Sequence, residues 1–303
     1  MSDATRGRWL VLGASVLWST SGAFAKSLHL PPSVMACYRV LFAGLFLSLF
    51  LRRRDVRWRF AILGMAMCFA IMNASFVWAI VLTTAANAIF LQYTAPAWML
   101  VFSVVFLHER LSLADVGVVA ISLVGVGVIL SGGGVDSWAG VGLALVAGVT
   151  YAAVAVFLRG LRGTSPVWLT TVNLLAGGLV LLPFAAWVDG PALVRLSWGQ
   201  GLGLAAFGIA QMALPYLLFA RGLSLVSAQE AGILTLAEPV LNPIVTFLAV
   251  GERPAPATIA GGALILGGLC ARYAVPIARR FKKRKPSAEP RRPEPPPASV
   301  SGG

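Results

Sequence analysis

Residues 234–254 read LTLAEPVLNPIVTFLAVGERP, an apolar run that carries Glu238 and two prolines near its middle. From Ala228 to Val250 the only other charged residue is Glu230, close to the start of the run. At 1.5 Å rise per residue, about 20 apolar residues in a helix cross about 30 Å of hydrocarbon. The stretch therefore predicts a transmembrane helix with an acidic side chain at mid-depth.

The composition of the whole chain is that of a membrane protein. Of the 303 residues, 58% are hydrophobic and only 12% are charged, whereas soluble domains are about 25% charged. The net charge of +13 would also suit a nucleic-acid-binding protein. However, the chain contains no nucleic-acid-binding motif, and its Lys and Arg lie mainly between the apolar runs. The composition therefore excludes a soluble domain and argues against a nucleic-acid partner.

Apolar runs of similar length recur along the chain, and we expect an all-α integral membrane protein with ten transmembrane helices. The expected spans are 9–28, 33–51, 60–80, 86–107, 114–131, 138–160, 166–187, 199–219, 228–250 and 257–275. The first run has no small-residue cleavage site ahead of a soluble domain, so we interpret it as a retained span rather than a signal peptide. Residues 1–8 then form a cytoplasmic N-terminus.

Basic residues are distributed unequally between the two sides of the membrane. The loops on the N-terminal side, together with the chain ends, carry 20 Lys and Arg, and the loops on the other side carry three. Both termini should therefore be cytoplasmic, in a bacterial plasma (inner) membrane. Residues 276–303 are basic and then Pro-rich, which predicts a disordered tail. Its RRFKKRK stretch should rest on anionic lipid headgroups, or act simply as a cytoplasmic anchor.

The two halves of the chain match each other. Residues align at an offset of 133, and after ten extra residues in the loop that follows the seventh span the offset becomes 143. Equivalent positions include Gly7/Gly140, Lys26/Arg159, Gly44/Gly177, Leu82/Leu225, Pro96/Pro239, Glu109/Glu252, Arg110/Arg253 and Gly125/Gly268. We expect the Glu-Arg pairs to form contacts at helix ends. Each half, 9–131 and 138–275, holds five spans, an odd number, so the second half enters the membrane from the opposite side. The sequence thus predicts an inverted repeat around one midplane site, which suits a transporter.

Four stretches give the chain a resemblance to a known family. They are VLWSTSGAFAKS (16–27), ACYRVLFAGLFL (36–47), LQYTAPAWMLVFSVVFLHERLS (91–112) and the run at 234–254 quoted above. Over residues 9–275 the chain resembles the EamA-type transporters of the drug/metabolite transporter superfamily. The resemblance implies ten helices in a basket around a central cavity, with export of amino acids or similar small metabolites. It does not identify the substrate.

Glu238 is the first candidate for the binding site. Pro239 and Pro243 have no amide N–H, so we expect a loosened helix beside the acid, where transporters commonly place binding groups. The equivalent position in the first half is Ala95, so the symmetry of the fold does not require the acid. Glu238 would bind a substrate ammonium or a coupling proton, with Glu230 as a second proton-coupling candidate. The alternative is a protonated Glu238 that only bonds a neighbouring helix. The residues that share its helix face, within about 80° of arc, are Thr235, Asn242 and Thr246.

Arg39 lies inside the second expected span. An arginine in hydrocarbon costs about 2.5 kcal/mol or more, so it must pair or reach the membrane surface. Arg39 would bind a substrate carboxylate, with a structural ion pair as the alternative. Trp18 in the first span and its equivalent, Tyr151, would form aromatic walls of the cavity, or else fill gaps between helices.

Other polar and aromatic residues within the spans complete the predicted site. With the four above, the predicted substrate-binding set comprises Asn73, Trp78, Gln92, Tyr93, Tyr216 and Asn242. Asn173 and Gln211 have the same polar character. For all of them, hydrogen bonding between helices is the alternative role.

Together these observations predict a transporter rather than an enzyme. We expect a monomeric exporter of small metabolites, amino acids first, that works by alternating access and contacts only its small-molecule substrate and membrane lipids. Efflux of hydrophobic cations is the alternative, and a scaffold without transport would not explain the polar residues at mid-depth. The sequence has no HExxH motif, nucleophile elbow or phosphate-binding glycine loop. Because Cys37, Cys68 and Cys270 fall in separate spans, no disulfide or metal site is expected. We expect no cofactor.

Overall fold

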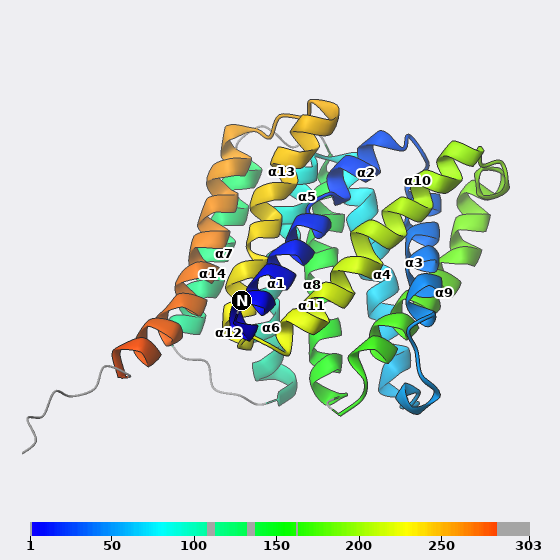
Figure 1. The fold of residues 1–303 in the computed structure, drawn as a ribbon. Helices are drawn as coiled ribbons and strands as arrows, with labels where there is room; N and C mark the ends of the chain where they lie inside the picture. Colours follow the sequence, from blue (N-terminus) through cyan, green and yellow to red (C-terminus); the bar gives the residue numbers. More distant parts are fainter. Residues whose placement is uncertain (1, 108–112, 132–136, 162, 284–303) are drawn as a thin grey trace, which may run out of the picture.

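The computed structural model describes residues 2–107, 113–131, 137–161 and 163–283, and within these residues every regular element is a helix (Figure 1). The first half contains α1 (Asp3–Trp18), α2 (Ser21–Ser27), α3 (Pro32–Ser48), the short 3-10 helix η1 (Arg53–Asp55), α4 (Ala61–Leu82), α5 (Ala85–Gln92), α6 (Ala95–Leu107) and α7 (Leu113–Ser131). The second half contains α8 (Trp138–Gly160), α9 (Pro166–Val194), α10 (Trp198–Gly208), the π-helix η2 (Ile209–Ala213), α11 (Leu214–Leu223), α12 (Ala228–Thr235), α13 (Ala237–Val250) and α14 (Pro256–Lys283).

Five helical stretches in the described residues are long and apolar enough to cross a membrane. They are Ala61–Leu82, Trp138–Leu158, Pro166–Val194, Trp198–Leu223 and Glu230–Val250. The shorter apolar helices Pro32–Ser48, Val116–Ser131 and Pro256–Ala271 match three more of the expected spans. The two remaining expected spans, 9–28 and 86–107, are each divided into two helices. Helix α14 also continues beyond residue 275, where the sequence predicted the start of a disordered tail.

Two of the helix breaks lie at equivalent positions in the two halves. The fourth expected span breaks at Tyr93 and Thr94, and the ninth breaks at Leu236. Pro96 and Pro239 follow these breaks, and a proline cannot supply the amide N–H that continues a helix. The predicted loosening beside Glu238 is therefore confirmed. Helix α13, in contrast, continues through the second proline of this span.

The break in the first expected span has no counterpart in the second half. Helix α1 ends where the Ser19 and Thr20 hydroxyls donate to the carbonyls of Val16 and Leu17, at 2.7 and 2.6 Å. Such bonds compete with the backbone hydrogen bonds of a helix. The equivalents are Ala152 and Ala153, and alanine is the best helix former. Accordingly α8 continues without interruption.

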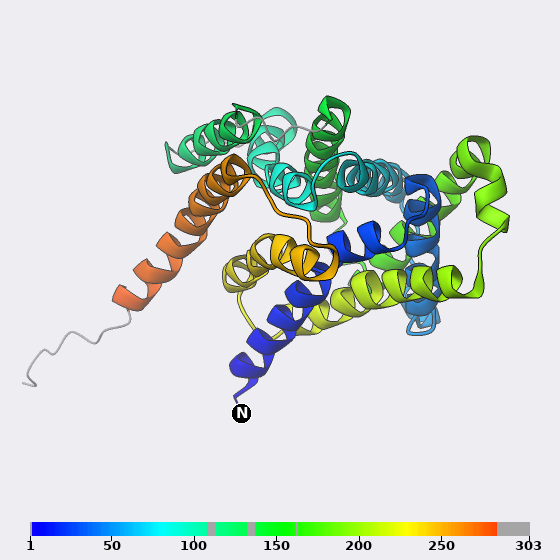
Figure 2. The same ribbon diagram turned by 90° about the horizontal axis from the view of Figure 1, so that it is seen from above.

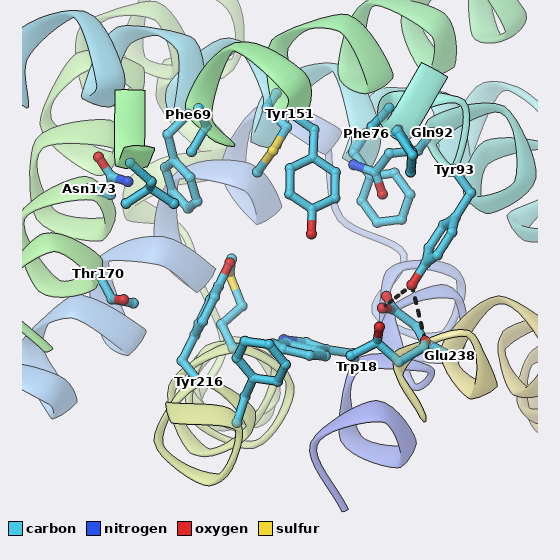
Figure 3. Close-up of a pocket in the computed structure, with 18 of the residues that line it drawn as sticks. Trp18, Phe69, Phe76, Gln92, Tyr93, Tyr151, Thr170, Asn173, Tyr216 and Glu238 are labelled. Atoms are coloured by element: carbon cyan, nitrogen blue, oxygen red, sulfur yellow. Dashed lines mark hydrogen bonds between the residues drawn. The ribbon is translucent and has the colours of Figure 1, made fainter. Parts of the chain in front are cut away.

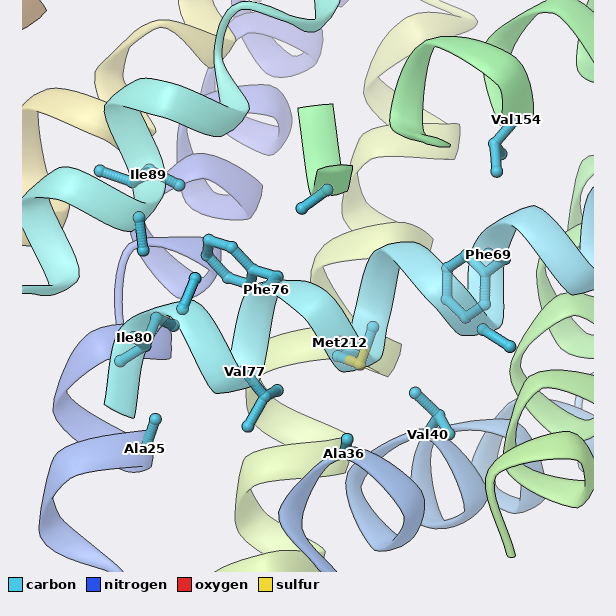
Figure 4. Close-up of a cluster of buried hydrophobic side chains, with 14 of the residues drawn as sticks. Ala25, Ala36, Val40, Phe69, Phe76, Val77, Ile80, Ile89, Val154 and Met212 are labelled. Atoms are coloured by element: carbon cyan, nitrogen blue, oxygen red, sulfur yellow. The ribbon is translucent and has the colours of Figure 1, made fainter. Parts of the chain in front are cut away.

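The helices pack in pairs that join the two halves. Helix α1 lies along α11, α4 along α8, α3 along α9, and α7 along α14. Seen from above in Figure 2, α7 and α14 stand side by side at one edge of the bundle. Apolar side chains from α2, α3, α4, α5, α8 and η2 form the central cluster shown in Figure 4. Phe69, Phe76, Val154 and Met212 of this cluster also border the cavity described next.

Candidate functional site

A cavity of about 340 Å³ lies at the level of the helix breaks (Figure 3). Aromatic side chains form part of its wall, namely Trp18, Phe69, Phe76, Tyr93, Tyr151, Tyr216 and Phe219. The Trp18 ring packs edge-on against Tyr216 and obliquely against Phe219, with ring centroids 5.4 and 5.5 Å apart. Most small-molecule sites are apolar and aromatic with a few polar groups, and this cavity is of that kind.

The cavity extends toward one end of the bundle. Its wall includes Leu158 near the end of α8, Thr170 near the start of α9, and Gly232 in α12. We call this end, drawn at the bottom of Figure 1, the α12 end. None of the described lining residues belongs to α2 or α10. The opposite end, formed by α2, the start of α5 and the end of α13, is called the α2 end.

The α2 end is closed by polar contacts between α2, α5 and α13. Lys26 forms an ion pair with Glu252 at 2.9 Å and donates to the carbonyl of Thr83 at 2.8 Å. The second carboxylate oxygen of Glu252 accepts the backbone N–H of Ala85 at 2.7 Å, in the first turn of α5. A carboxylate at this position is favoured because the first amides of a helix have no partner within the helix. The expected helix-end contact of Glu252 thus occurs at α5, and Arg253 instead lies over the Phe247 ring. Glu109 and Arg110 lie outside the described residues.

Deeper in the α2 end, a second set of contacts surrounds Gly22. Asn242 donates to the Ser21 hydroxyl at 2.8 Å, and both side chains are fully buried. A Cβ atom on Gly22 would overlap Thr246 and Ala85. Only glycine allows α2, α5 and α13 to approach this closely.

Glu238 lies at the beginning of α13 and borders the cavity. Its carboxyl group is 2.8 Å from the Tyr93 hydroxyl, which is also 3.3 Å from the backbone carbonyl of Thr235. In a regular helix the amide of residue 239 would bond this carbonyl, but Pro239 has no N–H. Tyr93, on the equivalent break in the first half, therefore contacts both the acid and the carbonyl that the proline leaves without a donor (Figure 3).

The hydroxyl of Tyr93 carries one proton, so it donates to one of these two oxygens at a time. A protonated Glu238 donates to Tyr93, which leaves the Tyr93 proton for the Thr235 carbonyl. An ionised Glu238 accepts the Tyr93 proton instead, and the carbonyl loses that donor. The hydrogen bonds around the helix break therefore depend on the protonation state of Glu238.

Arg39 is buried and borders the same cavity. Its Nε donates to Asn73 Oδ1 at 2.7 Å, and its Nη2 donates to the same oxygen. Asn73 is held in turn, because its amide donates to the Ala36 carbonyl at 2.8 Å. The guanidinium carbon lies 5.0 Å from the centre of the Phe207 ring. Both contacts are to neutral groups.

The structure brings together only part of the predicted set. Seven of the ten line the cavity, namely Trp18, Arg39, Gln92, Tyr93, Tyr151, Tyr216 and Glu238. Trp18 and Tyr151 lie on opposite sides of it (Figure 3). Asn73, Trp78 and Asn242 are not among the lining residues. Asn73 holds Arg39, Trp78 packs against Phe184 with ring centroids 5.7 Å apart, and Asn242 contacts Ser21. Glu230 is far from Glu238 along the span and pairs with Arg8 at 2.6 Å near the α12 end.

The cavity also contains two amides that the predicted set did not include. Gln211, in the π-helix η2, and Asn173, in α9, both line the wall. The signal in the sequence was a polar residue inside an apolar run, which also fits a helix contact. Within the described residues, no three His, Cys, Asp or Glu side chains come together as metal ligands.

Comparison with known proteins identifies the family. The model of the EamA-like transporter family matches residues 5–131 and again 138–272. A protein named "Uncharacterized transporter" from Archaeoglobus fulgidus is 28% identical over 87% of this chain and 94% of its own length. The "Uncharacterized transporter YxxF" of Bacillus subtilis is 25% identical over 90% of each chain. The "Probable terminal-alkyne amino-acid exporter" of Streptantibioticus cattleyicolor is 27% identical over 63% of this chain and 65% of its own.

A solved structure has the same fold. This crystal structure of a protein aligns with a TM-score of 0.63 at 20% identity, over 92% of this chain and 99% of the other. The family model covers most of the chain in two repeats, and the relatives are named as transporters. The chain therefore belongs to the EamA-like transporter family and is an integral membrane transporter.

Proposed function

We propose that this transporter exports small amphipathic metabolites, amino acids first, by alternating access through ten spans arranged as two inverted five-span repeats. The observation that carries the proposal is one aromatic cavity, bordered by a buried acid and a buried base, that extends toward one end of the bundle and is closed at the other. The protein works as a monomer in a bacterial inner membrane with both termini in the cytoplasm. The α12 end then faces the cytoplasm.

The helix pairing supports two repeats related by a two-fold axis. Helix α1 is equivalent to α8, and α11 is equivalent to part of α4. The packed pair α1 with α11 therefore has its counterpart in the packed pair α8 with α4. In the pairs α3 with α9 and α7 with α14, the two partners are equivalent helices of the two halves. Because each half holds five spans, an axis that relates them lies in the plane of the membrane.

Close helix contacts repeat in the same way. A Cβ atom on Gly7 would lie 2.7 Å from Cβ of Leu225, and one on Gly140 would lie 3.1 Å from Cβ of Leu82. Gly140 is the equivalent of Gly7, and Leu225 is the equivalent of Leu82. The same small residue thus meets the same leucine position on both sides of the bundle.

The difference between the two ends supports alternating access. The equivalents of Ser21 and Asn242, which touch at the closed end, are Val154 and Met99. Val154 and Met99 line the cavity. In the opposite conformation Val154 would meet Met99 and the contact between Ser21 and Asn242 would open.

The cavity chemistry supports a zwitterionic amphipathic substrate. Glu238 would bind the coupling proton or an ammonium group, and Arg39 a carboxylate, while Trp18, Tyr151 and Tyr216 would contact an apolar side chain. Gln92 and Tyr93 complete the wall. The relative named as an amino-acid exporter supports the same class. The acid within an aromatic wall also favours a second candidate, efflux of hydrophobic cations, and Arg39 argues against it.

The proposal is tested with purified protein in liposomes loaded with radiolabelled amino acids, purines or cationic dyes, with and without a proton gradient. We expect release of one or more amino acids. Glu238→Gln keeps the shape of the side chain, so it should insert normally and lose at least about 90% of transport or its dependence on the proton gradient. Wild-type rates in this variant across pH 5 to 8 would assign Glu238 a structural role. If no compound is released, the protein is not the proposed exporter.

A further inference from the structure

Among the described residues, the positive charge of Arg39 has no acidic partner. The ion pairs there are Arg8 with Glu230 and Lys26 with Glu252. Arg39 is 3% exposed, its contacts are with neutral groups, and its Nη1 has no hydrogen-bond partner. A buried charge without a counter-charge is costly. Because Arg39 borders the cavity, a ligand can supply the missing anion.

Two acceptor oxygens without partners belong to residues that border the same cavity. Gln211 and Asn173 are each 5% exposed, and neither Gln211 Oε1 nor Asn173 Oδ1 has a hydrogen-bond partner. The Nε2 of Gln211 donates to the Trp18 carbonyl at 3.3 Å, which assigns the oxygen to the opposite side of that amide. Buried polar atoms without partners are rare and costly, and a ligand or an ordered water can complete their bonding.

Packing places these groups on neighbouring elements. Both η2 and α9 pack against α3, which carries Arg39. Gly208, in the turn before η2, has no room for a side chain because its Cβ would meet the Arg39 carbonyl. The π-helix adds a residue to the turn that carries Gln211, a feature frequent at functional sites. Its equivalent stretch in α4 is a regular helix, and the equivalent of Gln211 is Cys68.

We propose that Arg39, Gln211 and Asn173 form the subsite for the head group of an α-amino acid. Arg39 Nη1 donates to the carboxylate, and the two amide oxygens accept from the ammonium group. The amino acid head group has these charges on adjacent carbons, so both must be met by neighbouring protein groups. In this conformation the three atoms are covered, and the side chains turn toward the cavity when the substrate enters.

The proposal deepens the proposed function and rests on it. It assigns the substrate a free carboxylate and a free amine, with an apolar side chain toward the ring of Trp18. It also separates the roles of the two buried charges. Glu238 lies across the cavity from Asn173 (Figure 3), and it remains for proton coupling rather than for the α-ammonium.

The test uses counterflow of radiolabelled phenylalanine in liposomes. Three unlabelled compounds are compared as competitors of the labelled phenylalanine. They are phenylalanine itself, phenylalaninamide, which lacks the carboxylate, and 3-phenylpropionate, which lacks the amine. In the wild type each analogue should compete at least about tenfold more weakly than phenylalanine, since either the Arg39 guanidinium or the two amide oxygens then lose their partner. Phenylalaninamide that competes as well as phenylalanine would overturn the carboxylate assignment.

Two variants assign the individual groups. Gln211→Leu should weaken competition by phenylalanine about tenfold and leave 3-phenylpropionate unchanged, because of these two compounds only phenylalanine has an amine. Arg39→Gln should bring phenylalanine to the level of phenylalaninamide. Equal loss for all three compounds would indicate misfolding or a structural role and would overturn the subsite.

The control variant is Ser122→Ala on α7. Ser122 is also buried with a hydroxyl that has no partner, but it does not line the cavity. Its competition profile should match the wild type. If the wild type transports other amino acids but not phenylalanine, the assignment of an apolar substrate side chain directed toward Trp18 is wrong. If it moves no amino acid, the proposed function fails as well.

Discussion

At the α2 end of the cavity Ser21 bonds Asn242, and Lys26 pairs with Glu252. At the α12 end the positions equivalent to Ser21 and Asn242 hold Val154 and Met99, and these two line an open space. The two ends are thus built from equivalent positions with different chemistry. One end is held closed by hydrogen bonds and an ion pair, whereas the pair of residues equivalent to Ser21 and Asn242 at the other end is apolar.

The difference favours the conformation of this structure, which is closed at the α2 end and open at the α12 end. Opening the α2 end leaves an amide, a hydroxyl and a carboxylate without their protein partners, at about 1 kcal/mol each when water replaces them. Closing the α12 end buries apolar side chains that already lie in a partly covered cavity, so the gain per residue is small. We therefore expect a resting state that is open at the α12 end, with substrate binding needed to reach the other state.

The largest effect should come from locking the closed end covalently. In a background without Cys37, Cys68 and Cys270, the pair Ser21→Cys and Asn242→Cys should form a disulfide, because the native side chains are in direct contact. Oxidation should abolish transport and a reductant should restore it. Each single cysteine variant is the control. Transport that continues at the full rate with a complete crosslink would show that this end does not open.

Removing the ion pair should shift the equilibrium between the two conformations. Lys26 and Glu252 are less than a quarter exposed, so Lys26→Gln should favour opening of the α2 end by about 1–2 kcal/mol. A disulfide between Val154→Cys and Met99→Cys reports closure of the α12 end, and it should form about tenfold faster in this variant. The exchange Lys26→Glu with Glu252→Lys should restore only part of the effect, since the Ala85 N–H needs an acceptor. An unchanged crosslinking rate would contradict the comparison of the ends.

Making the open end polar should reduce the difference between the ends. Val154→Ser with Met99→Asn gives the α12 end the same pair that closes the α2 end. One new hydrogen bond should favour closure by about 1 kcal/mol, or about fivefold. The closed fraction should rise by that factor, and labelling of Tyr151→Cys by a thiol reagent from the α12 side should slow as the open fraction falls. Faster labelling would mean that Val154 and Met99 do not meet in the second conformation.

The smallest effect should come from the ion pair at the α12 end. Arg8 and Glu230 have side chains 51% and 30% exposed, and exposed pairs contribute about 0–1 kcal/mol. Glu230→Gln should change the transport rate less than about twofold and leave proton dependence intact. Loss of proton dependence in this variant, with Glu238→Gln unaffected, would make Glu230 the coupling residue.

Some parts of the fold could be predicted from the sequence because their cause is local. The breaks at Tyr93 and Leu236 follow from proline residues at equivalent positions. The break after Trp18 was not predicted, although Ala152 and Ala153 stand at the positions equivalent to Ser19 and Thr20. Comparing the halves for hydroxyl residues would have found it.

The candidate site was predicted less well, because it depends on contacts between helices. Helical spacing does not show that Asn73 holds Arg39 or that Asn242 meets Ser21, since these residues lie on different helices. The sequence marks Gln211 as a polar residue within a span, but the predicted binding set does not include it. Its position in the wall depends on a π-helix, and the 3.6-residue period does not describe such a turn.

The contacts around the cavity have a consequence for the history of the chain. The bonds of Tyr93 with Glu238, Ser21 with Asn242 and Lys26 with Glu252 all join a residue of the first half to one of the second. A dimer of two identical halves would place two copies of Glu238 in one cavity, and two acids in a low dielectric repel each other. Joining both halves in one gene lets Ala95 stand where the second acid would be. Under the proposed function, duplication followed by fusion would permit a single proton site in a protein built from two matching halves.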